Sequence, residues 1–150
     1  MANSFTSINI HFVFSTKNRK CLIDDKIKSR LWGYMGGIAK DNKMTALAIG
    51  GTNNHVHMLL SMPAVLSPAK SIQLIKSNSS KWVNEEFRHK TGFSWQVGYS
   101  GFSVGPKQIK NVINYINRQE EHHRIKSFEE EYISFLEESG IEYEEQYVWG

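Results

Sequence analysis

Residues 44–61 read MTALAIGGTNNHVHMLLS, two apolar runs joined by a turn rich in glycine and asparagine. The runs have the length of strands, and so short a Gly/Asn link between them is typical of an antiparallel hairpin. Because side chains alternate across a strand, His55 and His57 project from one face and Val56 from the other. The stretch therefore predicts a sheet that carries two neighbouring imidazoles on one face.

The segments before this hairpin predict one strand and one helix. Residues 7–15 alternate between apolar and polar positions, as a half-buried strand does. A basic turn follows at 17–20, and an aspartate at 24–25 caps a helix with an apolar stripe. The glycines at 36–37 lower helix stability by about 1 kcal/mol each. They therefore suggest a close contact with another element.

The segments after the hairpin predict further helices and one strand. A serine followed by proline begins a helix at 67–87, and 95–104 is predicted to be a strand. Pro106 begins a helix to about residue 123, and a Ser127–Glu130 capping box begins a last one that ends before Gly140.

The order of these elements predicts the fold class. Strand, helix, strand, strand, helix, strand is the order of the ferredoxin-like, RRM-like split βαβ fold. We therefore expect an α+β protein with a four-stranded antiparallel sheet and helices on one face, the other face being open. The helix that holds Tyr115 and a further acidic helix follow this unit.

Charge divides the single predicted domain in two. The chain has 150 residues and a net charge of +3. Residues 1–126 hold all 18 Lys and Arg against seven Asp and Glu, which gives +11, whereas 127–150 hold eight acids and give −8. A basic core indicates a polyanionic partner, with nucleic acid first, although basic patches that bind nothing specific are common. Whether the acidic helix and tail cover this core is left open.

Composition excludes several other classes of protein. Cys21 is the only cysteine, so no internal disulfide can form, as is usual in a reducing cytoplasm. No apolar stretch approaches the roughly 18–20 residues of a membrane span, and no signal peptide is visible. We expect a cytoplasmic protein with no membrane partner.

Two pairs of residues point to chemistry. His55 and His57 provide half of a metal site, or else are polar residues on a sheet face. Tyr115 and Gln119 lie one helical turn apart, on the flank of an apolar stripe. Alone they are a boundary tyrosine and a surface glutamine.

Taken together, the two pairs fit phosphodiester transfer. Tyrosine can form a covalent phosphotyrosine, and a cation can polarise the scissile phosphate. The Gln119 oxygen can complete a site begun by two imidazoles, and Mg²⁺ or Mn²⁺ suits phosphate chemistry better than Zn²⁺.

These residues also resemble a known family. His55-Val56-His57 looks like the histidine–hydrophobic–histidine (HUH) motif, and Tyr115 to Gln119 looks like the Tyr-x-x-x-Gln helix that accompanies it. The chain thus resembles the single-tyrosine HUH transposases of the 200/605 group of bacterial insertion sequences, including their repeat-associated relatives. Further stretches match in the same order, namely 11–19, 95–99, 102–104 and 120–124. Asn54 departs from the family, in which aspartate commonly precedes the first histidine.

The resemblance implies a function and an assembly. Tyr115 would be the nucleophile, and His55, His57 and Gln119 would bind the metal. The family cleaves and rejoins single-stranded DNA through a 5′-phosphotyrosine, recognises hairpins near element ends, and forms homodimers in which the tyrosine helix can complete the partner's active site. The chain would be a transposase domain of a bacterium or archaeon, with a catalytic core at 1–126.

Candidate DNA contacts are the basic residues of the turn and of the later helices. Each is also consistent with a solvated side chain. They are Lys17, Arg19, Lys20, Lys76, Lys81, Lys107 and Lys110. His122 and His123 are either part of the site or a polar helix end.

Two other functions fit the same residues. A non-catalytic RRM-like module would bind nucleic acid by stacking bases on the open sheet face, without need of metal or Tyr115. A metal-dependent hydrolase of a small phosphoester would use water as nucleophile and release its product without a protein-linked intermediate.

Overall fold

The computed structural model describes residues 3–87, 92–123 and 125–150. Arg124, the last residue of the resemblance at 120–124, lies outside them. The strands are β1 (Asn9–Ser15), β2 (Thr45–Gly51), β3 (His55–Ser61) and β4 (Ser100–Ser103). The α-helices are α1 (Asp25–Asp41), α2 (Pro68–Glu86), α3 (Ile109–Asn117), α4 (Gln119–His122) and α5 (Phe128–Glu138). Short 3-10 turns lie at Lys17–Arg19, Pro106–Gln108 and Glu145–Tyr147.

Three predicted caps begin helices as expected. The Asp24 side chain accepts a hydrogen bond from the backbone N–H of Ile27. The Ser67 hydroxyl caps α2, and the Ser127 hydroxyl caps α5. Each cap satisfies a backbone donor that the first helical turn leaves unpaired. At the other end of α5, Gly140 takes the positive φ of 68° that favours glycine.

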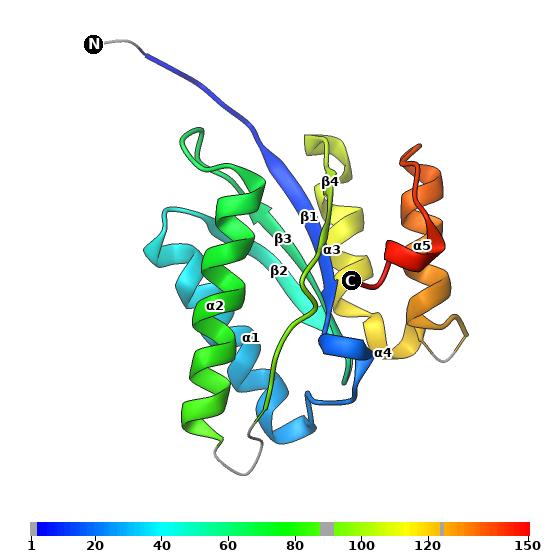
Figure 1. Ribbon diagram of the computed structural model, residues 1–150. Coiled ribbons are helices and arrows are strands. Elements are labelled where there is room, and N and C mark those ends of the chain that lie inside the picture. The colour runs from blue at the N-terminus through cyan, green and yellow to red at the C-terminus, as the bar shows by residue number, and fades with distance from the viewer. Residues whose placement is uncertain (1–2, 88–91, 124) are drawn as a thin grey trace.

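The four strands form one antiparallel sheet in the order β2-β3-β1-β4 (Figure 1). Val13 of β1 and Gly50 of β2 both pair with His57 of β3. Helices α1 and α2 cover one face, where Val56 and Met58 join the main core with Phe12. This arrangement confirms the predicted α+β class. Among the described residues, no helix is both long and apolar enough to cross a bilayer.

The second face of the sheet is covered, so the expectation of an open face is wrong. Helices α3 and α5 lie on the side opposite α1 and α2 (Figure 1). Leu59 packs there with Ile116 of α3, and Val13 packs with Phe128 of α5. These apolar strand residues share a face with the histidines and need cover from water. The histidine pair is therefore buried between sheet and helices.

The predicted strand at 95–104 is shorter than expected. Only Ser100–Ser103 form β4, and Trp95 makes a single bridge to Thr16. The Lys76 ammonium donates hydrogen bonds to the backbone oxygens of residues 96, 97 and 98, at 2.9, 3.2 and 2.5 Å. Three successive carbonyls that converge on one amine cannot alternate in direction as strand carbonyls do.

The predicted helix at 106–123 is also interrupted. Arg118 adopts φ −111° and ψ 25°, outside the helical range, so that α3 ends at Asn117 and α4 begins at Gln119. Asn117, the last residue of α3, is of a type that forms helices weakly and favours helix ends. The break re-aims the chain, and Gln119 is buried although both of its neighbours are exposed.

A glycine in β2, Gly50, allows α3 to pack closely on the sheet. A Cβ atom at Gly50 would lie 2.4 Å from the backbone oxygen of Ile116, so only glycine allows α3 to approach β2 this closely. The close contact suggested for the glycines at 36–37 is only partly found. A Cβ at Gly36 would lie 3.6 Å from Cδ1 of Ile49 in β2, an ordinary van der Waals contact, and a Cβ at Gly37 would meet nothing within 4 Å.

The two glycine positions predict opposite effects on stability. Gly37→Ala should raise the free energy of unfolding by about 0.5–1 kcal/mol, because alanine is the better helix former at an exposed interior position. Gly50→Ala should lower it by about 1–3 kcal/mol through overpacking. Urea unfolding of both variants tests this, and equal effects would contradict the assigned contact.

Candidate active site

The site is built around the two histidines of β3. Both His55 and His57 are completely buried, and their ring centroids lie 5.2 Å apart. The strand register directs them to the face covered by α3 and α5. Burial at zero exposure is unusual for imidazole and requires hydrogen-bond partners at both ring nitrogens.

His55 is held by the turn that precedes it. Its Nδ1 atom lies 3.0 Å from the Thr52 hydroxyl and 3.0 Å from the Asn54 side-chain oxygen. Its Nε2 atom lies 3.0 Å from the Gln119 side-chain oxygen. Asn54 thus orients the ring by hydrogen bonding, without the charge that an aspartate there would add.

His57 is held by a third histidine. Its Nδ1 atom lies 2.8 Å from Nε2 of His11, which is buried on the same face of β1. The other ring nitrogen, Nε2, lies 3.0 Å from Oε1 of Glu131. His11 was not predicted as a site residue, although its place on the histidine face of the first strand was a usable signal.

The buried rings resist protonation. Burial, with a smaller contribution from the neighbouring His57, lowers the pKa of both His11 and His55 to about 3. Neutral imidazole is the form that binds a metal ion. His55 is therefore available as a ligand across the physiological pH range.

Tyr115 lies beside the histidines in the same chain. Its ring centroid is 5.8 Å from that of His57, and its hydroxyl oxygen is 3.3 Å from Nε2 of His122. The hydroxyl donates a hydrogen bond to Oε2 of Glu131. Burial, and then this hydrogen bond, raise the pKa of Tyr115 above its ordinary value. The phenol is thus protonated while it rests against the carboxylate.

Glu131 of α5 lies at the centre of the site, and sequence analysis missed it. Its side chain is only 2% exposed. Burial opposes its ionisation, but hydrogen bonds from His123, His57 and Tyr115 keep the pKa of Glu131 well below the usual range. The available signal was its position three residues after Phe128 and four before Phe135, on the inward stripe of α5.

The donor set fits a divalent metal ion. Ligand atoms of His55, His57, His123 and Glu131 all lie within 4.8 Å of one another. Gln119 adds an oxygen 3.0 Å from Nε2 of both His55 and His123. Imidazole nitrogens and carboxylate or amide oxygens are the ligands that first-row dications prefer.

Comparison with known proteins identifies the family. The family described as "Transposase IS200 like" matches residues 4–119. The chain belongs to this family. Among curated proteins, no match was found.

Two solved structures share the fold of this IS200-like family member. One is a candidate transposase from Deinococcus radiodurans R1, with 20% identity, a TM-score of 0.64, and 79% of this chain and 95% of that chain covered. The other is a REP-associated tyrosine transposase bound to a REP hairpin, with 13% identity, a TM-score of 0.57, and coverage of 79% and 70%.

The candidate DNA contacts of this family member differ in their exposure. Arg19 pairs with Glu129 at 3.1 Å and lies over the ring of Trp149, so the acidic C-terminal segment does pack on the basic core. Lys76 is half-buried and holds the carbonyls of residues 96–98. The remaining candidates are exposed, namely Lys17, Lys20, Lys81, Lys107 and Lys110.

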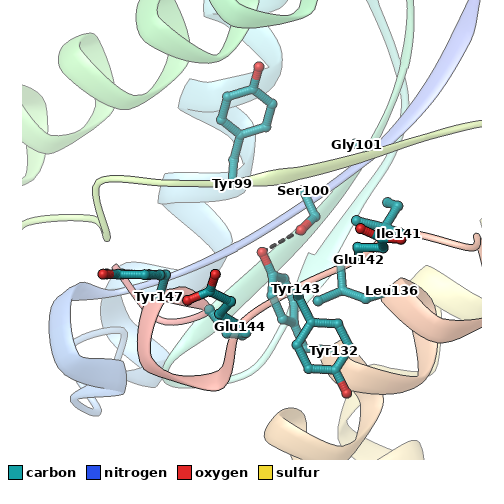
Figure 2. Close-up of a pocket in the computed structure, with 11 residues that line it drawn as sticks. Tyr99, Ser100, Gly101, Tyr132, Leu136, Ile141, Glu142, Tyr143, Glu144 and Tyr147 are labelled. Carbon is teal, nitrogen blue, oxygen red and sulfur yellow. Dashed lines mark hydrogen bonds between the residues drawn. The ribbon is translucent and has the colours of Figure 1, made fainter.

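A hollow outside the histidine site lies between β4, α5 and the C-terminal segment (Figure 2). Tyr132, Tyr143 and Tyr147 line it, and the Tyr132 hydroxyl accepts a hydrogen bond from Ser100 of β4. Glu142 and Glu144 also line it. Two carboxylates disfavour a phosphate there, so this hollow is not part of the candidate active site.

The buried histidines predict that acid destabilises the protein. An unfolded histidine binds a proton below about pH 6.5, whereas His11 and His55 bind one only near pH 3. Between these values the unfolded state holds more protons, so stability falls as the pH falls. In His11→Phe, the drop in the urea midpoint from about pH 7 to about pH 5 should be smaller than in the wild type. An unchanged drop would contradict the assignment.

Proposed function

We propose that this chain cleaves and rejoins single-stranded DNA, with Tyr115 as nucleophile and a divalent metal held by His55, His57 and Gln119. One observation supports this most directly. A phenol, two buried imidazoles and an amide oxygen come from β3, α3 and α4 and meet in one site within one chain. A resting phenol beside a metal-ligand set is what covalent phosphodiester transfer requires.

The proposed reaction conserves the phosphodiester bond. The Tyr115 oxygen attacks phosphorus, the bond to the 3′-oxygen breaks, and the products are a 5′-phosphotyrosine and a free 3′-hydroxyl. The phenolic proton leaves toward Oε2 of Glu131, which already accepts its hydrogen bond, and the departing 3′-oxygen takes up a proton from solvent to become the hydroxyl. A bound dication would polarise the phosphate oxygens.

Rejoining reverses these events. A DNA 3′-hydroxyl attacks the phosphotyrosine, and the phenolate leaves. With a pKa of ~10 in water, phenolate is a much better leaving group than a sugar alkoxide. Joining therefore needs no nucleotide cofactor.

The proposed substrate is a DNA strand next to a hairpin, in the cytoplasm of a bacterium or archaeon. A hairpin is bound in one of the structures that share this fold. Exposed lysines in the basic turn and at the start of α3 would contact phosphates. A homodimer would contain two such sites, each with its own tyrosine.

An adduct assay tests the proposal. The full chain is incubated with single-stranded DNA from the flanks of its own gene and Mg²⁺ or Mn²⁺, then run on a denaturing gel. We expect a labelled band that survives denaturation and disappears with protease. Cleavage without this band would favour a hydrolase that uses water. Binding without cleavage would favour an RRM-like module, although α3 and α5 cover the face on which such a module stacks bases.

A further inference from the structure

We propose that Glu131 and His123 are also ligands of the metal site, so that the ion is held by five side chains. This inference deepens the proposed function, because it concerns the ion of the same site. Both residues lie beyond residues 4–119, the part of the chain that matches the family. His123 follows α4 and Glu131 lies in α5, so the C-terminal segment would contribute two of the five ligands.

Distances between the donor atoms support a single coordination shell. Oε1 of Glu131 lies 3.0 Å from Nε2 of His57, 3.2 Å from Nε2 of His123 and 3.7 Å from Nε2 of His55. Metal–ligand bonds of about 2.1 Å place adjacent ligands about 3.0 Å apart in an octahedron and about 3.4 Å apart in a tetrahedron. The donors thus already have the spacing of ligands around one ion.

The position of Glu131 also needs an electrostatic explanation. A carboxylate that is 2% exposed is costly to bury unless a positive charge compensates it. A dication among these donors would add to the stabilisation that the hydrogen bonds already give the ionised carboxylate.

The chemistry of the five donors selects the kind of ion. Three imidazole nitrogens and two oxygens suit Mn²⁺, Co²⁺ or Zn²⁺. Mg²⁺ prefers oxygen ligands and keeps several waters. We therefore expect this site to prefer a transition-metal dication over Mg²⁺.

Glu131 also connects the ion site to the nucleophile. Its Oε1 atom faces the histidines, and its Oε2 atom accepts the hydrogen bond of Tyr115. One carboxylate thereby fixes the phenol next to the ion site. The Ser127 cap and the burial of Phe128 and Tyr132 hold the α5 backbone that carries it.

Metal binding without DNA tests the inference. The full-length wild type and Glu131→Gln are titrated with Mn²⁺, and the free ion is followed by its electron paramagnetic resonance signal. We expect Glu131→Gln to weaken Mn²⁺ binding by at least about 10-fold, since even residues outside the ligand shell commonly contribute that much. Glu130→Gln is the matched control, with the same charge change at an exposed neighbour, and should bind like the wild type.

His123→Asn provides a second variant, on a different element from Glu131. It should show a similar loss, and circular dichroism without metal checks that each variant folds. Wild-type affinity in either folded variant would overturn the assignment of that residue. Mg²⁺ that displaces Mn²⁺ at equal concentration would overturn the preference. Because no DNA is present, a failed adduct assay would leave this result intact, and the reverse also holds.

Discussion

Tyr115→Phe should abolish the covalent protein–DNA complex and lower strand cleavage by about 10⁴-fold or more, the scale of losing a nucleophile. The change removes one oxygen atom and leaves the ring that packs beside His57. The lost hydrogen bond to Glu131 should cost about 1–3 kcal/mol of stability, so the protein should still fold. A denaturing gel measures the adduct, and band shift with a hairpin measures retained binding.

Tyr143→Phe is the matched control for this experiment. Its hydroxyl also donates to a glutamate of α5, Glu137, at 3.0 Å, but Tyr143 lines the hollow between β4, α5 and the C-terminal segment. This variant should form adducts as the wild type does. Adducts that persist in Tyr115→Phe would show that another residue attacks the phosphate.

Local patterns were sufficient to predict the scaffold of the site. Strand β3 was predicted as the second apolar run of residues 44–61, because a Gly/Asn turn marks one end and alternation fixes the facing of His55 and His57. The helix caps at Asp24, Ser67 and Ser127 were predicted because capping depends on neighbours in the sequence. The structure brings Tyr115 and Gln119 to the histidines, while their chemical roles stay predictions.

Contacts between distant segments could not be predicted in this way. Glu131 belongs to the acidic run 129–131, where its neighbours are solvated or paired with surface residues. Only the docking of α5 against β1 distinguishes it, and that docking depends on Phe128 and Leu136 meeting Val13. The covered second face was missed for the same reason, since alternation in a strand indicates two faces but not what packs on each.

Mixing two inactive variants, one without the Tyr115 hydroxyl and one without the His57 imidazole, tests whether both groups of an active site come from the same chain. A mixture of Tyr115→Phe and His57→Ala chains should form no adduct, because the described chain brings its own phenol to its own imidazoles. Gly50 and Ile116 hold α3 against β2 of the same chain with no room for a side chain between them. To exchange tyrosines between subunits, α3 would have to leave this contact and expose Leu59 and Ala48.

Tags of different size on the two chains show, on a denaturing gel, which chain of the mixture carries the adduct. Each variant mixed with wild type should give adducts on the wild-type chain alone, which controls for dilution and misfolding. Adducts on the His57→Ala chain in the mixture of the two variants would mean that its Tyr115 had reached the histidines of a partner. That outcome would establish composite sites, as the family resemblance implies. The segment after Gly105, which includes α3, would then have to leave its own sheet and pack against the sheet of the partner subunit. Without such recovery, a homodimer serves to bring two complete sites to two DNA ends, because the chemistry at each end needs only one chain.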